Sequence, residues 1–172
     1  MQIITASPHD APVFARLNRH VHQLHLDNAP DSFHEPTHEE ATTSFRRQLS
    51  EKSAFAFLAI EADEAVGYLL AFVQEREANP FCPERRFLYI EQISVEPDQQ
   101  GQGVGRALMD AALQLAAQER IEDIEVSTWA FNRKAQAFFE SVGFEPRMIR
   151  YRMRLTGICW KTAPTPAPST WC

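Results

Sequence analysis

The sequence predicts a single α/β domain with about six to seven strands and about four helices. Segments rich in β-branched and aromatic residues alternate with segments whose apolar residues recur at helical spacing. The two patterns meet at a glycine-rich turn within residues 91–106, near the middle of the chain. The length of 172 residues and the hydrophobic content of 44% are those of one soluble globular domain.

The first helix follows a short strand candidate at residues 2–5. Its start is expected at Ser7 or Asp10, because a side-chain oxygen there can cap the free N–H groups of the first turn. The helix should fade before Pro30, since proline does not continue a helix.

A second helix and two strands complete the first half of the chain. Thr37 followed by Glu40 is a capping-box pattern, which predicts a helix over about 37–50. Residues 54–60 and 66–73 are rich in apolar and aromatic residues and are expected to be strands. The polar residues between them predict a tight hairpin turn.

The second half centres on a buried strand at residues 87–95. Pro97 stops this strand, because proline cannot donate to a sheet ladder. A long helix is expected at about 103–119, where apolar residues recur at helical spacing, followed by a strand at 123–129.

The last helix is expected to begin after Asn132, its cap, and to end at Gly143, which suits a left-handed position. Residues 144–146 and 149–155 are expected to finish the fold as strands. The second of these has the alternation of an edge or half-exposed strand.

A glycine-rich loop joins the central strand to the long helix. Glycines at 101, 103 and 105 let the backbone approach a ligand, and the helix start adds free N–H groups with a partial positive charge. These features predict a phosphate site. No Walker ending follows, and Arg106 or Leu108 stands where a dinucleotide fingerprint needs a small residue, which disfavours a nicotinamide-dependent oxidoreductase.

Two motifs resemble those of the GCN5-related N-acetyltransferase (GNAT) superfamily. Gln100-x-x-Gly103-x-Gly105 resembles its acyl-CoA pyrophosphate loop, and Asn132-x-x-Ala-x-x-x-Phe139-x-x-x-Gly-Phe resembles a helix found further along its members. The resemblance implies a mixed, mostly antiparallel sheet and transfer of an acetyl group from acetyl-CoA. The acceptor would be a primary amine of a small molecule or protein that attacks directly in a ternary complex.

The resemblance also implies which residues hold acetyl-CoA. Loop amides would bind the pyrophosphate, and the strand at 93–95 would pair with the pantetheine arm as a β-strand does. Asn132 would contact the cofactor, although a plain helix cap explains it equally well. The expected cofactor-binding residues are Ile93, Ser94, Val95, Gln100, Gly101, Gln102, Gly103, Val104, Gly105, Arg106, Asn132 and Phe139.

Glu91 is the candidate catalytic base. An ammonium group of pKa about 10.4 is deprotonated at neutral pH only at a cost of about 4–5 kcal/mol, so a base is useful. Glu91 lies on the central strand and resembles a glutamate that the family often uses there. Strict alternation puts it on one face with Ile93 and Val95, unless a bulge intervenes. The alternative is a half-exposed glutamate in an ion pair.

Phe139 departs from the family pattern, in which a tyrosine often protonates the leaving thiolate. A thiol of pKa about 8.5 leaves as the anion for only about 2 kcal/mol more, so the acid is dispensable. Tyr68, Tyr89, Tyr151 or a water could replace it. The missing tyrosine also keeps open a non-catalytic acyl-CoA-binding or regulatory module.

Five histidines gather in the first part of the chain, at positions 20, 22, 25, 34 and 38. No cysteine or carboxylate constellation completes a metal site among them, so solvated or core histidines are favoured and no metal is expected. The resemblance places the acceptor pocket near residues 25–33, where His25, Asp31 and Phe33 are the expected acceptor-side residues.

Charge and composition bear on partners and location. A net charge of −6 argues against nucleic acid and favours cationic partners such as amines. No apolar run is long enough for a bilayer, and the three cysteines form no disulfide or zinc pattern, so a cytoplasmic protein without a membrane partner is expected. The domain should span 1–155, with a Pro/Thr-rich tail at 156–172. A homodimer, through sheet edges or the tail, stays open.

Overall fold

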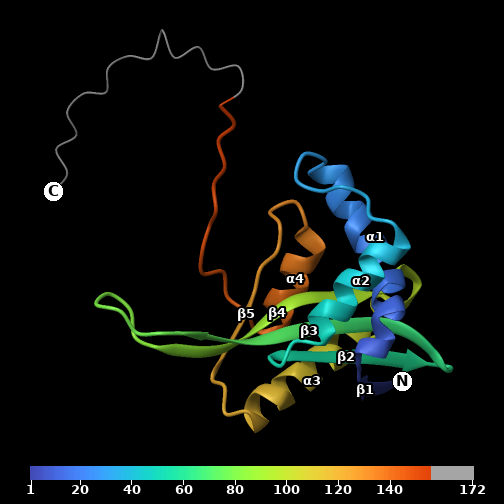
Figure 1. Ribbon diagram of the computed structural model, residues 1–172, viewed down its shortest axis with the longest axis horizontal. Coiled ribbons are helices and arrows are strands. Elements are labelled where there is room, and N and C mark those ends of the chain that lie inside the picture. The colour runs from blue at the N-terminus through green and yellow to red at the C-terminus, as the bar shows by residue number, and fades with distance from the viewer. Residues whose placement is uncertain (156–172) are drawn as a thin grey trace.

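The computed structural model describes residues 1–155, which form a five-stranded sheet with helices on both faces (Figure 1). The elements in chain order are β1 (Gln2–Thr5), η1 (Pro8–Asp10), α1 (Ala11–Asn28), α2 (His38–Leu49), β2 (Ala54–Glu61), β3 (Glu64–Arg76), β4 (Arg85–Val95), η2 (Pro97–Gln99), α3 (Val104–Gln118), β5 (Asp123–Val126) and α4 (Arg133–Val142). The predicted α/β class with four α-helices is confirmed. The predicted six to seven strands are wrong for the described residues, which contain five.

The strand order follows the chain from β1 to β5. Each neighbouring pair is antiparallel except β4 and β5, which are parallel because α3 carries the chain back between them. The mixed, mostly antiparallel sheet that the family resemblance implied is thus observed.

The core lies in two layers, one on each face of the sheet. Phe14 and Leu17 of α1 pack with the β3 residues Tyr68 and Leu70 on one face. The other face packs against α3, where Leu108 is fully buried. Each of these helices turns an apolar stripe toward the sheet. Since α1 and α3 lie on opposite faces, α1 covers one face of β4 and α3 covers the other.

Local signals in the sequence account for the boundaries of several elements. The Thr37 hydroxyl accepts a hydrogen bond from the Glu40 N–H over 3.2 Å, and the Glu40 carboxylate accepts one from the Thr37 N–H over 2.8 Å. The bonds that the carboxylate accepts from the Thr37 N–H and from the Thr37 hydroxyl lower the pKa of Glu40. The β2–β3 hairpin turns at Ala62 and Asp63, both with positive φ (48° and 65°), as a two-residue turn requires. Gly143 ends α4 with φ 109°.

The C-terminal part of the described chain corrects two strand predictions. Residues 144–146 and 149–155 are not strands, and β5 ends at Val126 rather than at residue 129. A strand needs a neighbouring backbone with which to form its ladder, and in residues 1–155 no backbone hydrogen bond joins 144–155 to the sheet. Figure 1 shows this segment running away from the sheet instead. The predicted tail at 156–172 lies outside the described residues.

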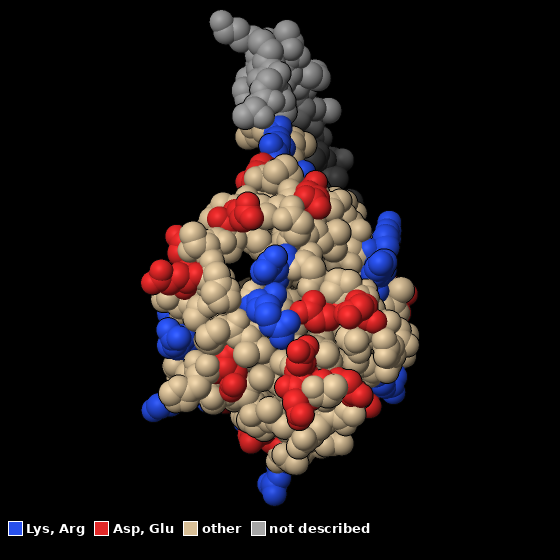
Figure 2. All heavy atoms as spheres, turned by 90° about the vertical axis from the view of Figure 1, so that its right-hand side faces the viewer, with Lys and Arg blue, Asp and Glu red and all other residues tan. Residues whose placement is uncertain are grey.

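Two observations concern the predictions about nucleic-acid and membrane partners: the distribution of charge on the surface and the character of the helices. Acidic and basic side chains are interspersed on the face seen in Figure 2. Across residues 1–155, no helix has both the length and the apolar character needed to cross a bilayer.

Candidate functional site

The strands β4 and β5 separate halfway along β4. They pair only over residues 87–90 of β4 and 123–126 of β5. Residues 91–95 of β4 therefore have no strand beside them on the β5 side in the described part of the chain. This half-strand, which contains Ile93, Ser94 and Val95, is a free edge to which an extended ligand can add by backbone hydrogen bonds.

A β-bulge sits at the point where the strands separate. Leu70 of β3 pairs with Gln92 and Ala71 pairs with Ile90, so Glu91 is the extra residue of the bulge. Because of it, Ile90 and Ile93 both pack against the α3-side core. The alternation that grouped Glu91 with Ile93 therefore fails at the bulge.

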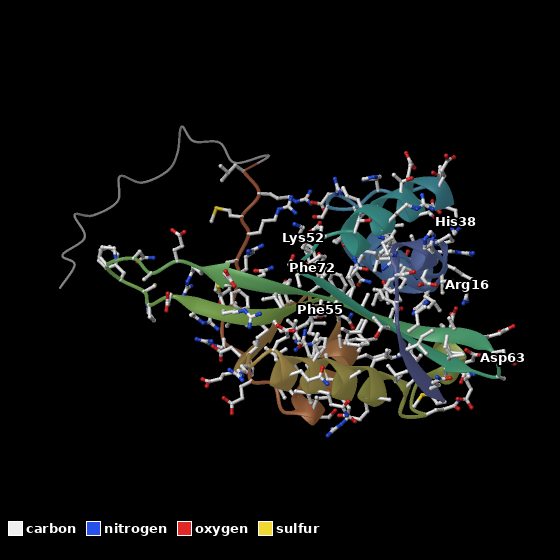
Figure 3. All side chains as sticks on the ribbon, turned by 60° about the horizontal axis from the view of Figure 1, so that its bottom comes forward. Arg16, His38, Lys52, Phe55, Asp63 and Phe72 are labelled. Atoms are coloured by element: carbon white, nitrogen blue, oxygen red, sulfur yellow. The ribbon has the colours of Figure 1, made fainter. Side chains whose placement is uncertain are left out.

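Glu91 lines a hollow of about 370 Å³ at the end of α2. The residues lining it are Gln48, Glu51, Ser53, Phe72, Val73, Gln74 and Glu91. Phe72 and Lys52, both labelled in Figure 3, lie near the point where β2 begins beside β3. None of the ion pairs in residues 1–155 includes Glu91, so the alternative of a paired glutamate is not observed there. Two carboxylates, two carboxamides and a hydroxyl give the hollow a polar, acidic lining.

The glycine-rich loop follows the free half of β4. Gly101 and Gly103 have φ of 79° and 86°, a left-handed conformation that side chains rarely adopt. A Cβ at either position would meet nothing within 4 Å, so the surface above them is open. Gly103 is also the N-cap of α3 and makes no side-chain capping bond, which leaves the first-turn N–H groups available to an anion.

Gly105 has a different role, because its neighbour is a helix and not open space. A Cβ there would lie 3.3 Å from the ring of Phe138, so this glycine lets the start of α3 approach α4. The side chain of Val104 is buried in the core, and its backbone alone reaches the loop. Arg106 is exposed and pairs with Asp110 over 3.2 Å.

Two glutamines brace the loop. Gln100 donates its side-chain N–H to the Val95 carbonyl over 3.1 Å, and Gln102 donates to the Asp98 carbonyl over 2.9 Å. Gln100 therefore ties the loop to the last residue of the free half-strand. The two features that would hold a nucleotide thioester are thus joined by a side-chain hydrogen bond.

The helix α4 places its two predicted cofactor residues differently. The Asn132 side chain accepts a hydrogen bond from the Ala135 N–H over 3.1 Å. It therefore caps the helix, which is the alternative to cofactor binding that the sequence offered. The ring of Phe139 is buried in the core beside Phe138 and Phe144. Its contribution here is packing between α4 and the sheet.

A buried polar group lies under α1. Asn18 donates to the Tyr68 hydroxyl over 2.8 Å, and that hydroxyl donates to Gln92 Oε1 over 2.7 Å. Burial raises the pKa of Tyr68 strongly. Of the three tyrosines considered as acids, Tyr68 is therefore committed to this network, and Tyr151 is 87% exposed on the C-terminal segment.

The Ser94 side chain points to the same face. Its hydroxyl donates to the Leu17 carbonyl over 2.9 Å and lies 3.1 Å from His20 Nε2. Burial lowers the pKa of His20, and nearby Glu96 opposes this effect. Because its hydroxyl is held under α1, Ser94 can contribute only backbone groups to the free edge of β4.

An aromatic cluster joins α1 to the loop before α4. His25 stacks on Phe33 with ring centroids 4.9 Å apart, and Trp129 meets Phe33 at 5.3 Å and Phe131 at 5.6 Å. Burial and the neighbouring His22 lower the pKa of His25. The structure thus brings together two of the three predicted acceptor-side residues, His25 and Phe33. The sequence analysis missed Trp129 and Phe131, which lie about a hundred residues away in the chain.

Asp31 lies outside this cluster. Its carboxylate forms ion pairs with Arg152 and Arg154 of the C-terminal segment, and Arg152 also donates to the Ser32 hydroxyl over 3.1 Å. These pairs neutralise the carboxylate, which counts against its use as a ligand for an acceptor ammonium group. In residues 1–155, no three His, Cys, Asp or Glu side chains gather closely enough to hold a metal ion.

Gly67 of β3 is a positioning residue that the sequence analysis missed. A Cβ there would lie 3.0 Å from the Ser94 carbonyl oxygen and 3.2 Å from Leu108 and Val104. The glycine therefore lets α3 pack closely against the sheet beside the site. An isolated glycine inside a strand pattern was the available signal.

Comparison with curated proteins gives relatives of known name. The mycothiol acetyltransferase of Propionibacterium freudenreichii subsp. shermanii is 30% identical over 145 residues, which are 80% of this chain and 46% of that protein. The mycothiol acetyltransferase of Kocuria rhizophila is 43% identical over 53 residues, 31% of this chain and 18% of that one. The chain thus spans less than half the length of these relatives.

Comparison with solved structures supports the fold. The tetramutant of the BH1408 protein from Bacillus halodurans superposes with a TM-score of 0.84 at 22% identity, covering 90% of this chain and 100% of that one. The aminoglycoside enzyme AAC(6')-Iy, in complex with a CoA-containing bisubstrate analogue, gives a TM-score of 0.68 at 19% identity, covering 89% and 97%. At these identities the likeness concerns the fold alone.

The sequence also matches a family model, over residues 19–144. That range holds the bulged half-strand, the glycine-rich loop and the capped helix α4, and it covers more than half of the chain. The chain belongs to the acetyltransferase (GNAT) family.

Proposed function

We propose that this chain is an N-acetyltransferase that transfers an acetyl group from acetyl-CoA to a primary amine by direct attack in a ternary complex. One observation carries the proposal: the free half of β4 is joined to the open N-terminus of α3 by η2 and by the glycine-rich loop, which Gln100 ties back to Val95. An extended pantetheine chain fits the first and a pyrophosphate the second. The AAC(6')-Iy complex, whose bisubstrate analogue contains CoA, supports this use of the fold.

In this proposal the pyrophosphate of acetyl-CoA lies over Gly101 and Gly103, where the surface is open. The amides from there into the first turn of α3 would bind it, as a helix N-terminus binds an anion. The pantetheine arm would hydrogen bond to the backbone at 93–95, and backbone N–H groups near the bulge would stabilise the thioester oxygen as negative charge develops on it.

Glu91 is proposed as the general base. It stands at the bulge, lines the hollow with Glu51 and is free of ion pairs in the described residues. It would take a proton from the acceptor ammonium group, directly or through a water. The neutral amine then attacks the thioester carbon, and the new C–N bond forms. The C–S bond breaks with release of the CoA thiolate, and the second proton of the nitrogen passes to water or to that thiolate, which leaves the neutral amide. The low cost of releasing a thiolate makes a dedicated acid dispensable, which suits the phenylalanine at 139.

The acceptor is proposed to carry further polar groups. The hollow at Glu91 is lined by carboxylates, carboxamides and a hydroxyl, which suit a cationic, hydrogen-bonding amine. The relatives named for mycothiol and the neighbours named for aminoglycosides support a polar amine acceptor in general terms. His25 and Phe33 are proposed to form a second wall of the acceptor site.

The test is CoA release from acetyl-CoA with a panel of amines, comparing the wild type with Glu91→Gln. Near neutral pH the variant should lose about a hundredfold to ten-thousandfold in kcat with little change in affinity for CoA. Glu77→Gln, an exposed glutamate on a loop, is the matched control and should keep full activity. CoA binding without acceptor-dependent release would favour the alternative function, an acyl-CoA-binding module, which the missing tyrosine at 139 also favours. Absence of CoA binding would refute both.

A further inference from the structure

A second hollow, of about 440 Å³, lies on the side of the sheet that α1 and α2 cover. The residues lining it are Pro12, Val13, Arg16, Arg19 and His38. The first four belong to α1, at spacings that share one face of that helix, and His38 is the first residue of α2. Arg16 and His38, both labelled in Figure 3, lie on the opposite side of the sheet from α3. The hollow is therefore separate from the one at Glu91.

The lining of this hollow contains three basic side chains and no carboxylate. Arg19 and His38 are exposed, and neither forms an ion pair within residues 1–155. The chain has 23 acidic side chains against 17 lysines and arginines, so carboxylates are in excess. Arg16 and Arg19 also place like charges next to each other on α1, which destabilises a helix. Basic groups gathered in this way on an acidic protein indicate an anionic ligand.

Arg16 is fixed in place by bonds to two other parts of the chain. One terminal nitrogen of its guanidinium donates to Glu96 over 2.8 Å, and the other donates to the Ala65 carbonyl over 2.7 Å. These bonds use two of the five N–H groups of an arginine, and the side chain remains 47% exposed. The other N–H groups are available to a ligand, in a planar fork that matches the oxygens of a carboxylate or a phosphate.

The size of the hollow and its apolar lining indicate more than an inorganic anion. Sites for small organic molecules have volumes of about 300–1,000 Å³ and combine apolar walls with a few charged groups that fix the orientation of the ligand. Pro12 and Val13 supply the apolar wall here, and Val13 packs against the core layer under α1. A ligand with a short carbon skeleton can contact this wall while its charged groups meet the basic side chains.

We propose that this hollow binds a small organic dianion, either a dicarboxylate or a phosphate monoester. Arg16 and Arg19 would hold its oxygens through charge-assisted hydrogen bonds, and His38 would donate a further one. Its carbon skeleton would lie against Pro12 and Val13. Dicarboxylates and phosphate monoesters share the same chemistry, two negative charges beside a short apolar group, and one probe of each class distinguishes them.

The dianion site does not overlap the site proposed for acetyl-CoA. The acetyl-CoA site is built from the free edge of β4 and the start of α3, whereas α1 and α2 alone line the hollow. The nearest connection is the Arg16–Glu96 pair, since Glu96 follows the last residue of β4. The two ligands can therefore bind at the same time, and the dianion is a second ligand of the protein.

The first experiment is calorimetric titration of the full chain with succinate, a dicarboxylate, and with phenyl phosphate, a phosphate monoester. At least one of them should bind saturably, and the tighter one identifies the class of ligand. Arg19→Gln should weaken that binding at least about tenfold, because it removes charge-assisted hydrogen bonds and breaks no ion pair. Arg47→Gln, at an exposed arginine in the last turn of α2, is the matched control and should keep the wild-type affinity. Absence of binding by both probes, or equal affinities of the two variants, would overturn the proposal.

Two further titrations separate a specific site from general attraction by charge. Arg19→Lys keeps the positive charge and loses the planar fork, so it should weaken binding severalfold. An affinity equal to that of the wild type would show attraction by charge alone and overturn the proposal.

The second titration repeats the first with the protein saturated with CoA, which should not displace the dianion. Displacement would make the hollow part of the cofactor site and overturn the proposal. The circular dichroism spectrum of each variant checks that the fold is retained. Because none of these measurements depends on turnover, a protein that binds CoA and neither probe would refute the dianion site and leave the proposed function untouched.

Discussion

The Tyr68 hydroxyl donates a hydrogen bond of 2.7 Å to Gln92 Oε1, its diagonal neighbour across the β3–β4 pair and the residue that follows the bulge. If the strand alternated regularly through Glu91, Gln92 would share the face of Ile90 and point into the apolar core under α3. The bulge instead turns Gln92 toward α1, where Asn18 also donates to it over 3.0 Å. This buried network fixes the register in which Glu91 stands at the opening between β4 and β5.

The network predicts that removing one oxygen atom, that of the Tyr68 hydroxyl, lowers the stability of the fold. Tyr68→Phe would remove the hydroxyl that accepts from Asn18 and donates to Gln92, and would leave only the direct Asn18–Gln92 bond between them. The loss of two part-buried hydrogen bonds should lower the free energy of unfolding by about 1–3 kcal/mol. Denaturant unfolding measures this change. Tyr151→Phe removes the same atom from a side chain that is 87% exposed and should leave stability within experimental error. Equal effects of the two variants would refute the role given to the network.

Gly103 should matter for CoA binding through its backbone. Alanine there adopts φ 86° only at a cost of about 1–2 kcal/mol, so Gly103→Ala should weaken CoA binding about five- to thirtyfold in titration calorimetry. Gly143→Ala is the matched control, since Gly143 also has positive φ and open space around its Cα. It should destabilise the fold and leave the affinity for CoA unchanged. A comparable loss of affinity in both variants would contradict the proposed pyrophosphate site.

Two histidines should make stability depend on pH. Burial lowers the pKa of His20 and His25 in the folded state, so the unfolded chain binds protons more readily. Stability should therefore be constant well above pH about 6.5 and fall as the pH drops below that value. The melting temperature measured across this range should fall less steeply for His20→Gln. The control His9→Gln changes an exposed histidine and should keep the wild-type slope; an unchanged slope in His20→Gln would refute the prediction.

Replacing Phe33 should weaken the use of the amine acceptor and leave binding of CoA unchanged. It stacks on His25 and meets Trp129, so its removal should loosen the wall proposed for the acceptor site. Phe33→Ala is expected to raise the KM for the amine about two- to tenfold while the Kd for CoA stays unchanged. Phe81→Ala, at a ring that is 94% exposed, should change neither constant. A KM equal to the wild-type value would remove Phe33 from the acceptor site.

Much of the site was predictable from sequence because its signals are local. The glycine spacing predicted a turn whose backbone can approach a ligand closely, and in the structure Gly101 and Gly103 of this turn have positive φ. The capping patterns at Thr37 and Asn132 placed the starts of α2 and α4. Each of these signals depends on residues within one or two turns of each other, which a sequence displays directly.

Other parts of the site could not be found this way. The residues around Glu91 come from α2, from the turn before β2 and from β3, and the aromatic cluster joins His25 to Trp129, so only the folded chain brings them together. The strand predicted at 149–155 has the correct alternation but no partner within the described chain. A pattern of period two shows that a segment can be a strand, whereas a ladder requires a neighbouring backbone.

The sequence by itself determined the order of the helices and strands, the phosphate-type loop and the family of this protein. The tertiary structure alone decided which face of β4 each side chain meets, because one extra residue in the register of β3 and β4 reverses the alternation. It also decided where β4 and β5 part, since that depends on how far their ladder extends. Periodicity is a local property of the chain, whereas register is set by contacts between segments that are distant in it.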